Sequence, residues 1–321
     1  MVKEHKRDLF LHRNMSDILN HIEENHKETQ RLIGLPYEEL QQLLQNAERL
    51  HHEKQALLEA KKVRIIAGGG GRKPKLSLPE QIILTLVYLR HMTTFQLLGI
   101  QFGVSESTAN DTFNYWWPHL RELLPSSLLE QVKKNAADHA IVKEILTEYE
   151  LIVDTYEQVR ERPGDKDEQE KYFSGKKSNH TFKSQIIIMP DGRDIVDVVA
   201  GEPGPKSDIT LFREYRSEFD PQQRFKGDKA YVGEDLITTP IKKPRNRELT
   251  TEQKEQNKAF SARRIFVEHR IRTVKIFRVA QERFRLNPQK YEQVILTICG
   301  IVRLRIGALI LPLGKAGKGS D

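Results

Sequence analysis

Three carboxylates occur at positions where a folded chain could bring them to one point. Asp154 follows the apolar run "LIV", Asp228 stands in "FKGDKAYVG", and Glu268 lies in a long helical segment. Burying a charged carboxylate among apolar residues is unfavourable unless the charge is paired or holds a cation. Strand ends are also where α/β folds place their chemistry, because the sheet is rigid and the loops beyond it are open. We therefore expect these acids to form a site for a cation.

Each acid also has a simpler interpretation, which the residues alone leave open. A Gly-Asp pair such as the one ending at Asp228 is common turn chemistry between elements. Glu268 could form a surface ladder of salt bridges with Arg264 and Arg272, one helical turn away on either side. Asp208 could be a fourth acid of the site, but its place before "ITLFRE" favours the N-cap of a helix.

The elements that must carry these acids alternate between strands and helices. "ELIVDTYEQV" predicts a strand with Asp154 in its middle, and "FKSQIIIMPDGRDIVDVVAG" predicts a hairpin that turns at Pro190-Asp191-Gly192. A short helix over 208–216, a strand ending in "FKGDKAYVG" and one long helix over 250–283 follow. This order is that of an RNase H-like core, in which the first and fourth strands lie side by side. Asp154 and Asp228 would then come within reach of one cation.

The long helix has a polar stripe next to an apolar one. At about 100° per residue, an arc of roughly 80° is polar and carries Glu268 as its only acid. We therefore expect the helix to pack on the sheet by its apolar stripe and to present the polar stripe at the sheet's edge. The polar stripe consists of Asn257, Ser261, Arg264, Glu268, Arg272 and Lys275, and the apolar stripe of Phe260, Val267, Ile271 and Val274.

The first part of the chain is helical in pattern. In an N-terminal helical region over 1–66, Gly34 closes one helix and Pro36 suits the first turn of the next. The leucine stripe of that next helix could form a short coiled coil for dimerisation or pack on the same chain. A flexible basic linker over 67–76 follows, and its "GRKPK" could lie in a DNA minor groove. The stripe consists of Leu40, Leu43, Leu44, Ala47, Leu50, Leu57 and Leu58.

Residues 77–135 have the features of a helix-turn-helix domain. Thr93 or Thr94 can cap a first helix, Gly103 allows the tight turn, and Ser105 caps a second helix. Short polar side chains early in that second helix suit contacts with bases or phosphates. A helical hairpin without a DNA role would have the same pattern. The candidate DNA contacts are Ser105, Ser107, Asn110 and Asn114.

The charge distribution favours a polyanionic partner. The chain of 321 residues has a formal net charge of +7 and a pI near 9.2, with basic stretches at 61–75, 240–247 and 263–290. These stretches could contact phosphates or could simply be solvated faces. Cys299 is the only cysteine, which excludes an intrachain disulfide and a thiolate metal cluster. The start of the chain has no signal-peptide pattern and Arg303 interrupts the most apolar segment, so we expect an intracellular protein.

Several motifs in a fixed order carry a resemblance to one family. The chain resembles the DDE transposases of bacterial insertion sequences, in the insertion-sequence-five, Harbinger-like group, over about Gln30 to Arg305. The N-terminal "RLIGLPYEEL" and the segment from "GGRKPKLS" to "STANDTF" are similar to that group's helix-turn-helix region. The resemblance implies an α/β RNase H-like catalytic domain over 145–310, a mixed sheet flanked by helices, after an all-α DNA-binding region. The catalytic motifs are "IVDT", "YFSGKKSNHTFKSQIIIMPDG", "SDITLFRE", "FKGDKAYVG" and "NKAFSARRIFVEHRIRTVK".

The resemblance also implies a reaction and its partners. Asp154, Asp228 and Glu268 would be the catalytic triad and would hold two Mg²⁺ ions per site, for which Mn²⁺ substitutes. Water would free a 3′-hydroxyl at the element end, and this hydroxyl would then attack target DNA. The partners would be transposon-end inverted repeats, target DNA and a second copy of the chain in a homodimer, at the nucleoid of a bacterial cytoplasm. The family usually has an Asp-Gly pattern at the first aspartate, where this chain has Thr155.

Basic residues near these motifs are expected to contact the DNA backbone. A structural role for His180 as a loop histidine is equally consistent with the pattern. Two other functions would use the same features, a DNA-binding regulator that has lost catalysis and a metal-dependent nuclease without strand transfer. The expected backbone contacts are Arg72, Lys73, Lys75, Lys176, Lys177, His180, Lys183, Lys242, Lys243, Arg245, Arg264, Arg272 and Lys275.

Overall fold

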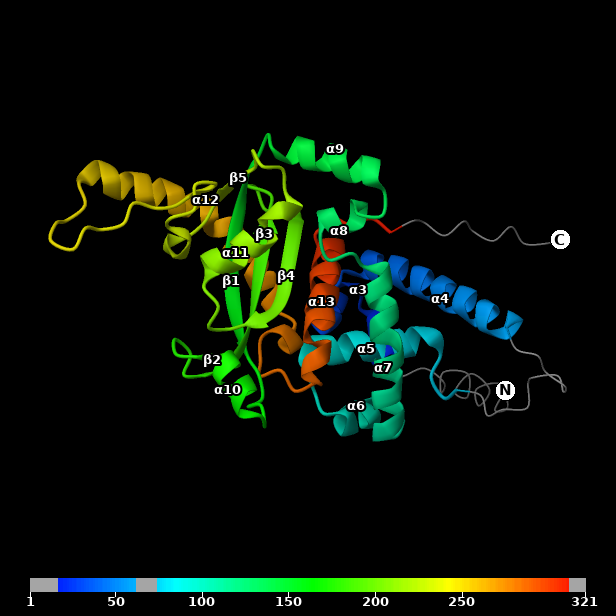
Figure 1. Ribbon diagram of the computed structural model, residues 1–321. Coiled ribbons are helices and arrows are strands. Elements are labelled where there is room, and N and C mark those ends of the chain that lie inside the picture. Colours follow the sequence, from blue (N-terminus) through cyan, green and yellow to red (C-terminus); the bar gives the residue numbers. More distant parts are fainter. Residues whose placement is uncertain (1–16, 62–73, 312–321) are drawn as a thin grey trace, which may run out of the picture. The chain divides into compact units, whose positions relative to one another are not determined.

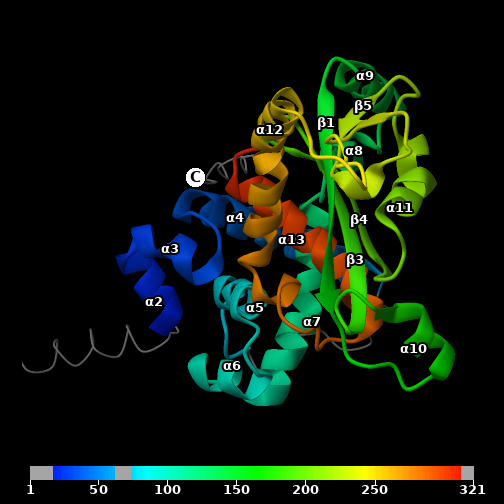
Figure 2. The ribbon, with the colours of Figure 1, turned by 90° about the vertical axis from the view of Figure 1, so that its left-hand side faces the viewer.

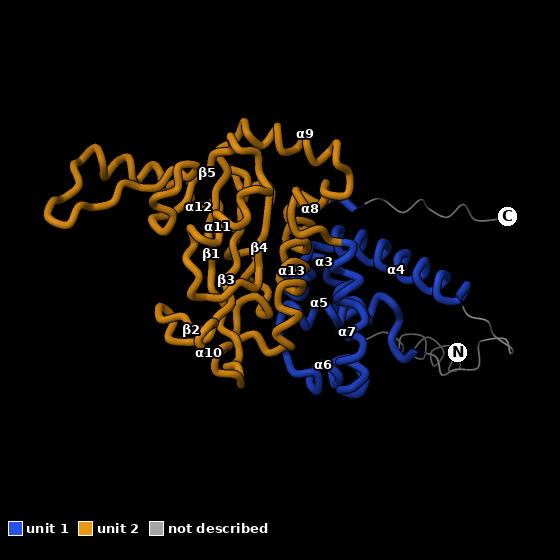
Figure 3. The backbone as a smooth tube through the Cα atoms, viewed as in Figure 1, with its two compact units in different colours: residues 1–123, 310–321 blue, residues 124–309 orange. Residues whose placement is uncertain are grey.

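The chain separates into two compact units, which are described one at a time. The computed structural model describes residues 17–61 and 74–311 (Figure 1). One unit comprises residues 1–123 with 310–321, and the other comprises residues 124–309 (Figure 3). Within the described ranges no helix is both long and apolar enough to cross a membrane. The boundaries of the predicted functional domains stay predictions.

The described part of the first unit is built from α-helices. They are α2 (Asp17–Glu24), α3 (His26–Ile33), α4 (Tyr37–Ala60), α5 (Leu78–His91), α6 (Phe95–Gln101) and α7 (Glu106–Leu123). Gly34 ends α3 in the left-handed region at φ 88°, as the sequence predicts. Pro36 differs slightly from its predicted place, because it precedes α4 as the N-cap instead of standing in the first turn.

The first half of the leucine stripe on α4 packs inside this unit. The four stripe residues from Leu40 to Ala47 are buried, and α4 contacts α3, α5 and α7. Leu57 and Leu58, near the end of the helix, are 64% and 51% exposed. Of the two alternatives that the sequence leaves open, packing on the same chain therefore accounts for the first half of the stripe.

Helices α6 and α7 form the predicted helix-turn-helix arrangement. Thr94 caps α6, because its hydroxyl accepts a hydrogen bond from the Leu97 N–H at 3.2 Å. Ser105 does the same for α7, with its Oγ 3.1 Å from the Thr108 nitrogen. Gly103 makes the turn between them at φ 66°. The predicted capping residues are thus confirmed.

The second unit is built on a six-stranded mixed sheet. Its strands are β1 (Glu150–Val159), β2 (Phe173–Ser174), β3 (Asn179–Ile188), β4 (Ile195–Pro203), β5 (Arg224–Lys226) and β6 (Ile237–Thr238). Strand β3 pairs antiparallel with β1, β2 and β4, whereas β5 lies between β1 and β6 and is parallel to both. The predicted hairpin is β3–β4, and the predicted neighbours are β1 and β5. Both are confirmed, while the short strands β2 and β6 were not expected.

Helices cover both faces of this sheet. They are α8 (Leu128–Val132), α9 (Ala136–Leu146), α10 (Lys166–Tyr172), α11 (Asp208–Tyr215), α12 (Thr251–Lys275) and α13 (Tyr291–Arg305). Figure 2 shows α12 and α13 on one face and α11 on the other. The core on the α11 side includes Val153, Ile187, Phe212 and Phe225. The predicted fold class, an RNase H-like α/β domain after an all-α helix-turn-helix region, is confirmed.

Helix α12 ends earlier than the sequence predicts. It stops at Lys275 instead of Arg283. The side-chain amide of Gln158, on β1, donates hydrogen bonds to the carbonyl oxygens of Val279 at 2.8 Å and Glu282 at 2.7 Å. The backbone leaves the helical region at Phe277, with φ −81° and ψ 110°, and the two carbonyl groups beyond it bind the sheet. The prediction of one continuous helix is wrong because helical periodicity contains no signal of this tertiary contact.

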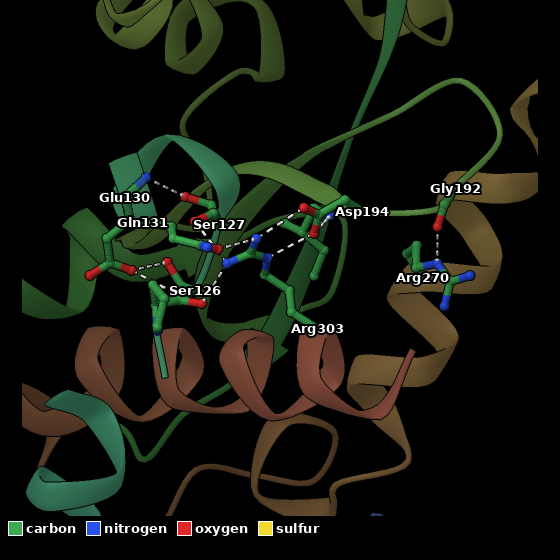
Figure 4. Close-up of polar contacts among 10 residues, drawn as sticks. Ser126, Ser127, Glu130, Gln131, Gly192, Asp194, Arg270 and Arg303 are labelled. Atoms are coloured by element: carbon green, nitrogen blue, oxygen red, sulfur yellow. Dashed lines mark hydrogen bonds and ion pairs between the residues drawn. The ribbon is translucent and has the colours of Figure 1, made fainter. Parts of the chain in front are cut away.

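A buried ion pair joins four segments of the second unit. Arg303, on α13, is 0% exposed and binds both carboxylate oxygens of Asp194, at 2.7 and 2.9 Å. Its guanidinium also donates to the carbonyl oxygens of Pro125 at 3.1 Å and Ser127 at 3.0 Å, and to the side chain of Gln131 at 2.9 Å. Figure 4 shows these groups converging on the guanidinium. One side chain therefore connects α13 to the start of the unit, to α8 and to the β3–β4 hairpin.

Replacing Arg303 by methionine should lower the free energy of unfolding by about 3–5 kcal/mol, because the buried Asp194 carboxylate then has no counter-charge. Urea denaturation followed by circular dichroism measures the loss. The double variant Arg303→Met/Asp194→Asn should recover most of it, and Arg278→Met at an exposed ion pair should cost less than about 1 kcal/mol. A loss as small as that of the exposed control would contradict the role of Arg303.

Candidate active site

Asp154 lies on β1, and Asp228 follows the end of the adjacent parallel strand β5 by two residues. Ile152 on β1 pairs with Lys226 on β5, and each aspartate follows its paired residue by two positions. Parallel strands advance by the same distance per residue, so the two aspartates stay aligned. The carboxyl groups come close enough for the charge of Asp228 to raise the pKa of Asp154. The structure thus brings the first two predicted acids together.

The chain turns sharply at Asp228. Strand β5 ends just before Gly227, where a Cβ atom would lie 2.6 Å from the ring of Tyr231, so a side chain does not fit. Asp228 Oδ1 accepts a hydrogen bond from the Ala230 N–H at 2.8 Å. No hydrogen bond of its Oδ2 is found in the described chain. Asp228 can therefore cap the turn and also bind a ligand, because Oδ1 accepts from the turn and Oδ2 is available.

Asp154 has too little positive charge around it to compensate its burial. Its Oδ1 accepts a hydrogen bond from the Thr155 N–H at 2.8 Å, and its Oδ2 lies 3.1 Å from Nη2 of Arg264. Burial raises the pKa of Asp154 to about 6, although Arg264 and the Thr155 N–H lower it, and the charges of Asp228 and Asp208 raise it further. A further cation would stabilise the ionised carboxylate. The donors are carboxylate oxygens, which fit Mg²⁺.

Glu268 lies on the stripe of α12 that faces β1. Two other members of this stripe reach the strand, since Arg264 binds Asp154 and Lys275 lies 5.0 Å from the centre of the Tyr156 ring. Glu268 stands between them along the helix and is exposed. The helix that carries Glu268 thus packs against the strand that carries the first aspartate.

In this structure Glu268 does not form a metal-binding group with Asp154 and Asp228. Across residues 17–61 and 74–311 there is no group of three His, Cys, Asp or Glu side chains able to hold a metal ion. In the same ranges Glu268 forms no ion pair with Arg264 or Arg272, so the alternative of a salt-bridge ladder is wrong. Glu268, Arg272 and Lys275 instead line a hollow of about 370 Å³. The assignment of Glu268 as a metal ligand stays a prediction.

A lysine-rich cavity of about 540 Å³ opens beside the two aspartates. Thr155 and Ala230 line it, so it borders the chain next to both acids. Lys176 and Lys177 are exposed there, and burial together with the charge of Lys177 lowers the pKa of Lys275. Lys183 and Lys206 are paired with carboxylates, so Lys176, Lys177 and Lys275 are the lysines of this cavity that a phosphate group could bind. The lysines that line the cavity are Lys176, Lys177, Lys183, Lys206 and Lys275.

Lys183 and Asp208 form an internal ion pair at 2.7 Å. Lys183 is only 6% exposed, so its ammonium stabilises the fold and is not free to bind DNA. The prediction that Asp208 caps α11 is wrong, because Ser207 is the cap and accepts a hydrogen bond from the Thr210 N–H at 3.2 Å. Serine and aspartate both suit an N-cap, and the pattern alone does not choose between neighbours. Asp208 instead lines the lysine-rich cavity, and its charge raises the pKa of Asp154.

The predicted DNA contacts of the first unit lie around α7. Ser107 is exposed, whereas Ser105 Oγ is used as the cap of α7. The side-chain amide of Asn114 donates to the backbone and side-chain oxygens of Asn110, at 3.0 and 2.7 Å. Lys75 Nζ lies 3.5 Å from the Gly103 carbonyl oxygen, at the turn. Arg72 and Lys73 lie outside the described residues.

The remaining predicted contacts lie on the second unit. Figure 1 shows the segment between β6 and α12, with the first half of α12, extending away from the sheet. Lys242, Lys243 and Arg245 are exposed on this segment, and Lys243 pairs with Glu248. His180 stacks edge-on against a phenylalanine ring away from the lysine cavity, and burial and nearby arginines lower its pKa.

Comparison with known proteins gives two family matches and a relative. Residues 153–303 match the family described as "DDE superfamily endonuclease", and residues 74–126 match "Helix-turn-helix of DDE superfamily endonuclease". A protein of Microchaete diplosiphon named "Probable transposase for insertion sequence element IS702" is 32% identical over 225 residues. The aligned region is 69% of this chain and 78% of that protein.

Two solved structures are also similar to the chain. They are "Crystal structure of a pre-cleavage Mos1 transpososome", at 12% identity and a TM-score of 0.17, and "Mos1 transposase paired-end complex with left transposon end", at 10% identity and a TM-score of 0.18. They cover 72% and 74% of this chain and 86% and 88% of their own chains. These TM-scores are too low to bear on the arrangement of the site.

Proposed function

The chain belongs to the DDE transposases of insertion sequences, and we propose that it binds the ends of its own element, cuts them and joins them to target DNA. The observation that supports this proposal is the approach of Asp154, on β1, and Asp228, just after the adjacent parallel strand β5, beside a lysine-rich cavity. Water attacks the phosphorus atom at the element end and displaces the 3′-oxygen. The freed 3′-hydroxyl then attacks a phosphate of target DNA and displaces a second 3′-hydroxyl.

The family depends on a divalent metal, and we propose two Mg²⁺ ions per site, with Mn²⁺ as a substitute. When bound, such ions neutralise charge on the phosphate and assist the attacking and leaving oxygens. Asp154 and Asp228 would hold them from the sheet, and Glu268 from α12. The three carboxylates serve as ligands and do not attack the DNA.

The other residues of the site orient the DNA. Lys176, Lys177 and Lys275 would bind phosphates next to the scissile one, because they line the cavity that borders both aspartates. The start of α7 would enter the major groove at the element end. The exposed segment that carries Lys242 and Arg245 would hold the backbone further away. Chromosomal DNA as substrate would keep the protein at the nucleoid.

Asp228→Asn should abolish both cutting and joining of labelled DNA that carries the element's own ends, since a neutral amide is a weak metal ligand. Asp154→Asn and Glu268→Gln should lose at least about 10³-fold in rate for the same reason. Gel analysis of products with Mg²⁺, with Mn²⁺ and with EDTA measures the change. Glu255→Gln, an exposed acid on the same helix, is the matched control and should keep wild-type activity.

The two alternative functions give different products in this assay. Tight binding of the ends without reaction in any protein, even with Mn²⁺ and supercoiled substrate, would favour a DNA-binding regulator. Cutting without any joined product would favour a nuclease. Full activity of Asp228→Asn would contradict the site itself.

Neutralising Lys242 and Arg245 should make DNA binding less sensitive to salt. Each phosphate contact contributes about 0.9 to the slope of log K against log salt, so Lys242→Gln/Arg245→Gln should reduce the slope by about 2. Fluorescence anisotropy at several salt concentrations gives the slope. Lys134→Gln/Lys166→Gln removes the same charge from exposed sites elsewhere and should leave it unchanged. Equal slopes for both double variants would exclude the proposed contact.

We expect a homodimer on paired element ends, because joining requires both ends together. The exposed Leu57 and Leu58 at the end of α4 are a surface that a second copy could cover. Sedimentation velocity of the protein alone and with end DNA measures the stoichiometry. A monomer in both states would exclude the dimer.

A further inference from the structure

An ion pair connects the helix that carries Glu268 to the strand that carries Asp154. Nη2 of Arg264 lies 3.1 Å from Oδ2 of Asp154, and the two side chains are 12% and 18% exposed. Because the Thr155 N–H binds Oδ1, both oxygens of Asp154 already have a partner. The positive charge of the guanidinium lies against Oδ2 and repels a divalent cation that would use this oxygen as a ligand.

Arg264 has little else to hold it in this position. A guanidinium has five N–H donors, and the bond to Asp154 is the one side-chain contact found for Arg264 among the described residues. Its Nε is buried without a hydrogen-bond partner. Glu268, one turn further along α12, forms no ion pair with it. The guanidinium is therefore under-satisfied and would gain from an anion with more acceptor oxygens.

A DNA phosphate is such an anion. Thr155, next to Asp154 on β1, and Lys275, on the same helix as Arg264, both line the lysine-rich cavity, so the cavity borders the strand and the helix that carry this ion pair. Arginine binds phosphate through two parallel hydrogen bonds, which one carboxylate oxygen does not offer. Moving to the phosphate would satisfy more donors of Arg264 and would free Oδ2 of Asp154.

We propose that Arg264 hinders the binding of divalent cations to Asp154 in the free protein. Bound DNA removes this hindrance, because a phosphate draws the guanidinium away from Asp154. This inference rests on the proposed function and adds a regulation of the same site. Binding of metal and binding of DNA are then linked through one side chain. Linkage is reciprocal, so DNA raises the affinity for metal by the factor by which metal raises the affinity for DNA.

The test is Mn²⁺ binding by the full chain without DNA, measured from the electron paramagnetic resonance signal of free Mn²⁺ at about pH 8, where Asp154 is ionised. Arg264→Gln should bind Mn²⁺ about tenfold more tightly than wild type, within the usual range of coupling between sites. Arg263→Gln removes the same charge from the exposed neighbouring position and should bind like wild type. Asp154→Asn should lose the binding and so identifies the site.

A second measurement adds a short DNA duplex of arbitrary sequence. The duplex should raise the Mn²⁺ affinity of wild type and of Arg263→Gln about tenfold, and should leave that of Arg264→Gln nearly unchanged. If circular dichroism shows that Arg264→Gln does not fold, Arg264→Met keeps the apolar stem and replaces it in both measurements.

Two results would overturn the inference, and they separate it from the proposed function. If Asp154→Asn loses Mn²⁺ binding while Arg264→Gln binds no more tightly than wild type, Arg264 does not exclude the metal, and the proposed cutting and joining still stand. If Asp154→Asn binds Mn²⁺ like wild type in every condition, the metal site itself is elsewhere, and both proposals fail.

Discussion

A carboxylate inside a sheet needs a positive charge, and this need shapes the second unit. Asp154 stands in the middle of β1, directly after an apolar run, and Arg264 reaches it from α12. Helix α12 itself packs through the buried side chains of Val267, Ile271 and Val274. A lysine cavity on one side and a second aspartate on the other complete the surroundings of this one charge. The negative charge of Asp154 makes burial of this part of β1 unfavourable, and the same charge attracts a cation.

Parallel pairing of β1 with β5 is the second requirement. Only three residues of β5 pair with β1, yet their register aligns Asp154 with Asp228, which are far apart in the sequence. The close approach of Gly227 to Tyr231 then sets the direction in which the chain leaves the strand. The short strand β5 and Gly227 thus position Asp228.

Local patterns made much of this architecture predictable from the sequence. Alternating β-branched runs around "PDG" predicted the β3–β4 hairpin, and Thr94, Gly103 and Ser105 predicted the helix-turn-helix turn. Contacts between distant residues were not predictable. The segment after α12 binds an amide of Gln158 instead of continuing the helix, and Arg264 turns to Asp154 and not to Glu268, although helical spacing allows both. Periodicity shows which face a side chain lies on but not which of two partners it chooses.

The position of Arg303 has a consequence for how the chain folds during synthesis. Its partners at Pro125, Ser127, Gln131 and Asp194 are all made long before it, and their carbonyl and carboxylate groups have no guanidinium until α13 is complete. While the ribosome is still adding the residues between them, the sheet is present without the charge that joins its segments. The second unit can therefore reach its final state only after α13 has emerged, and a nascent chain arrested before α13 would remain open to proteases and chaperones.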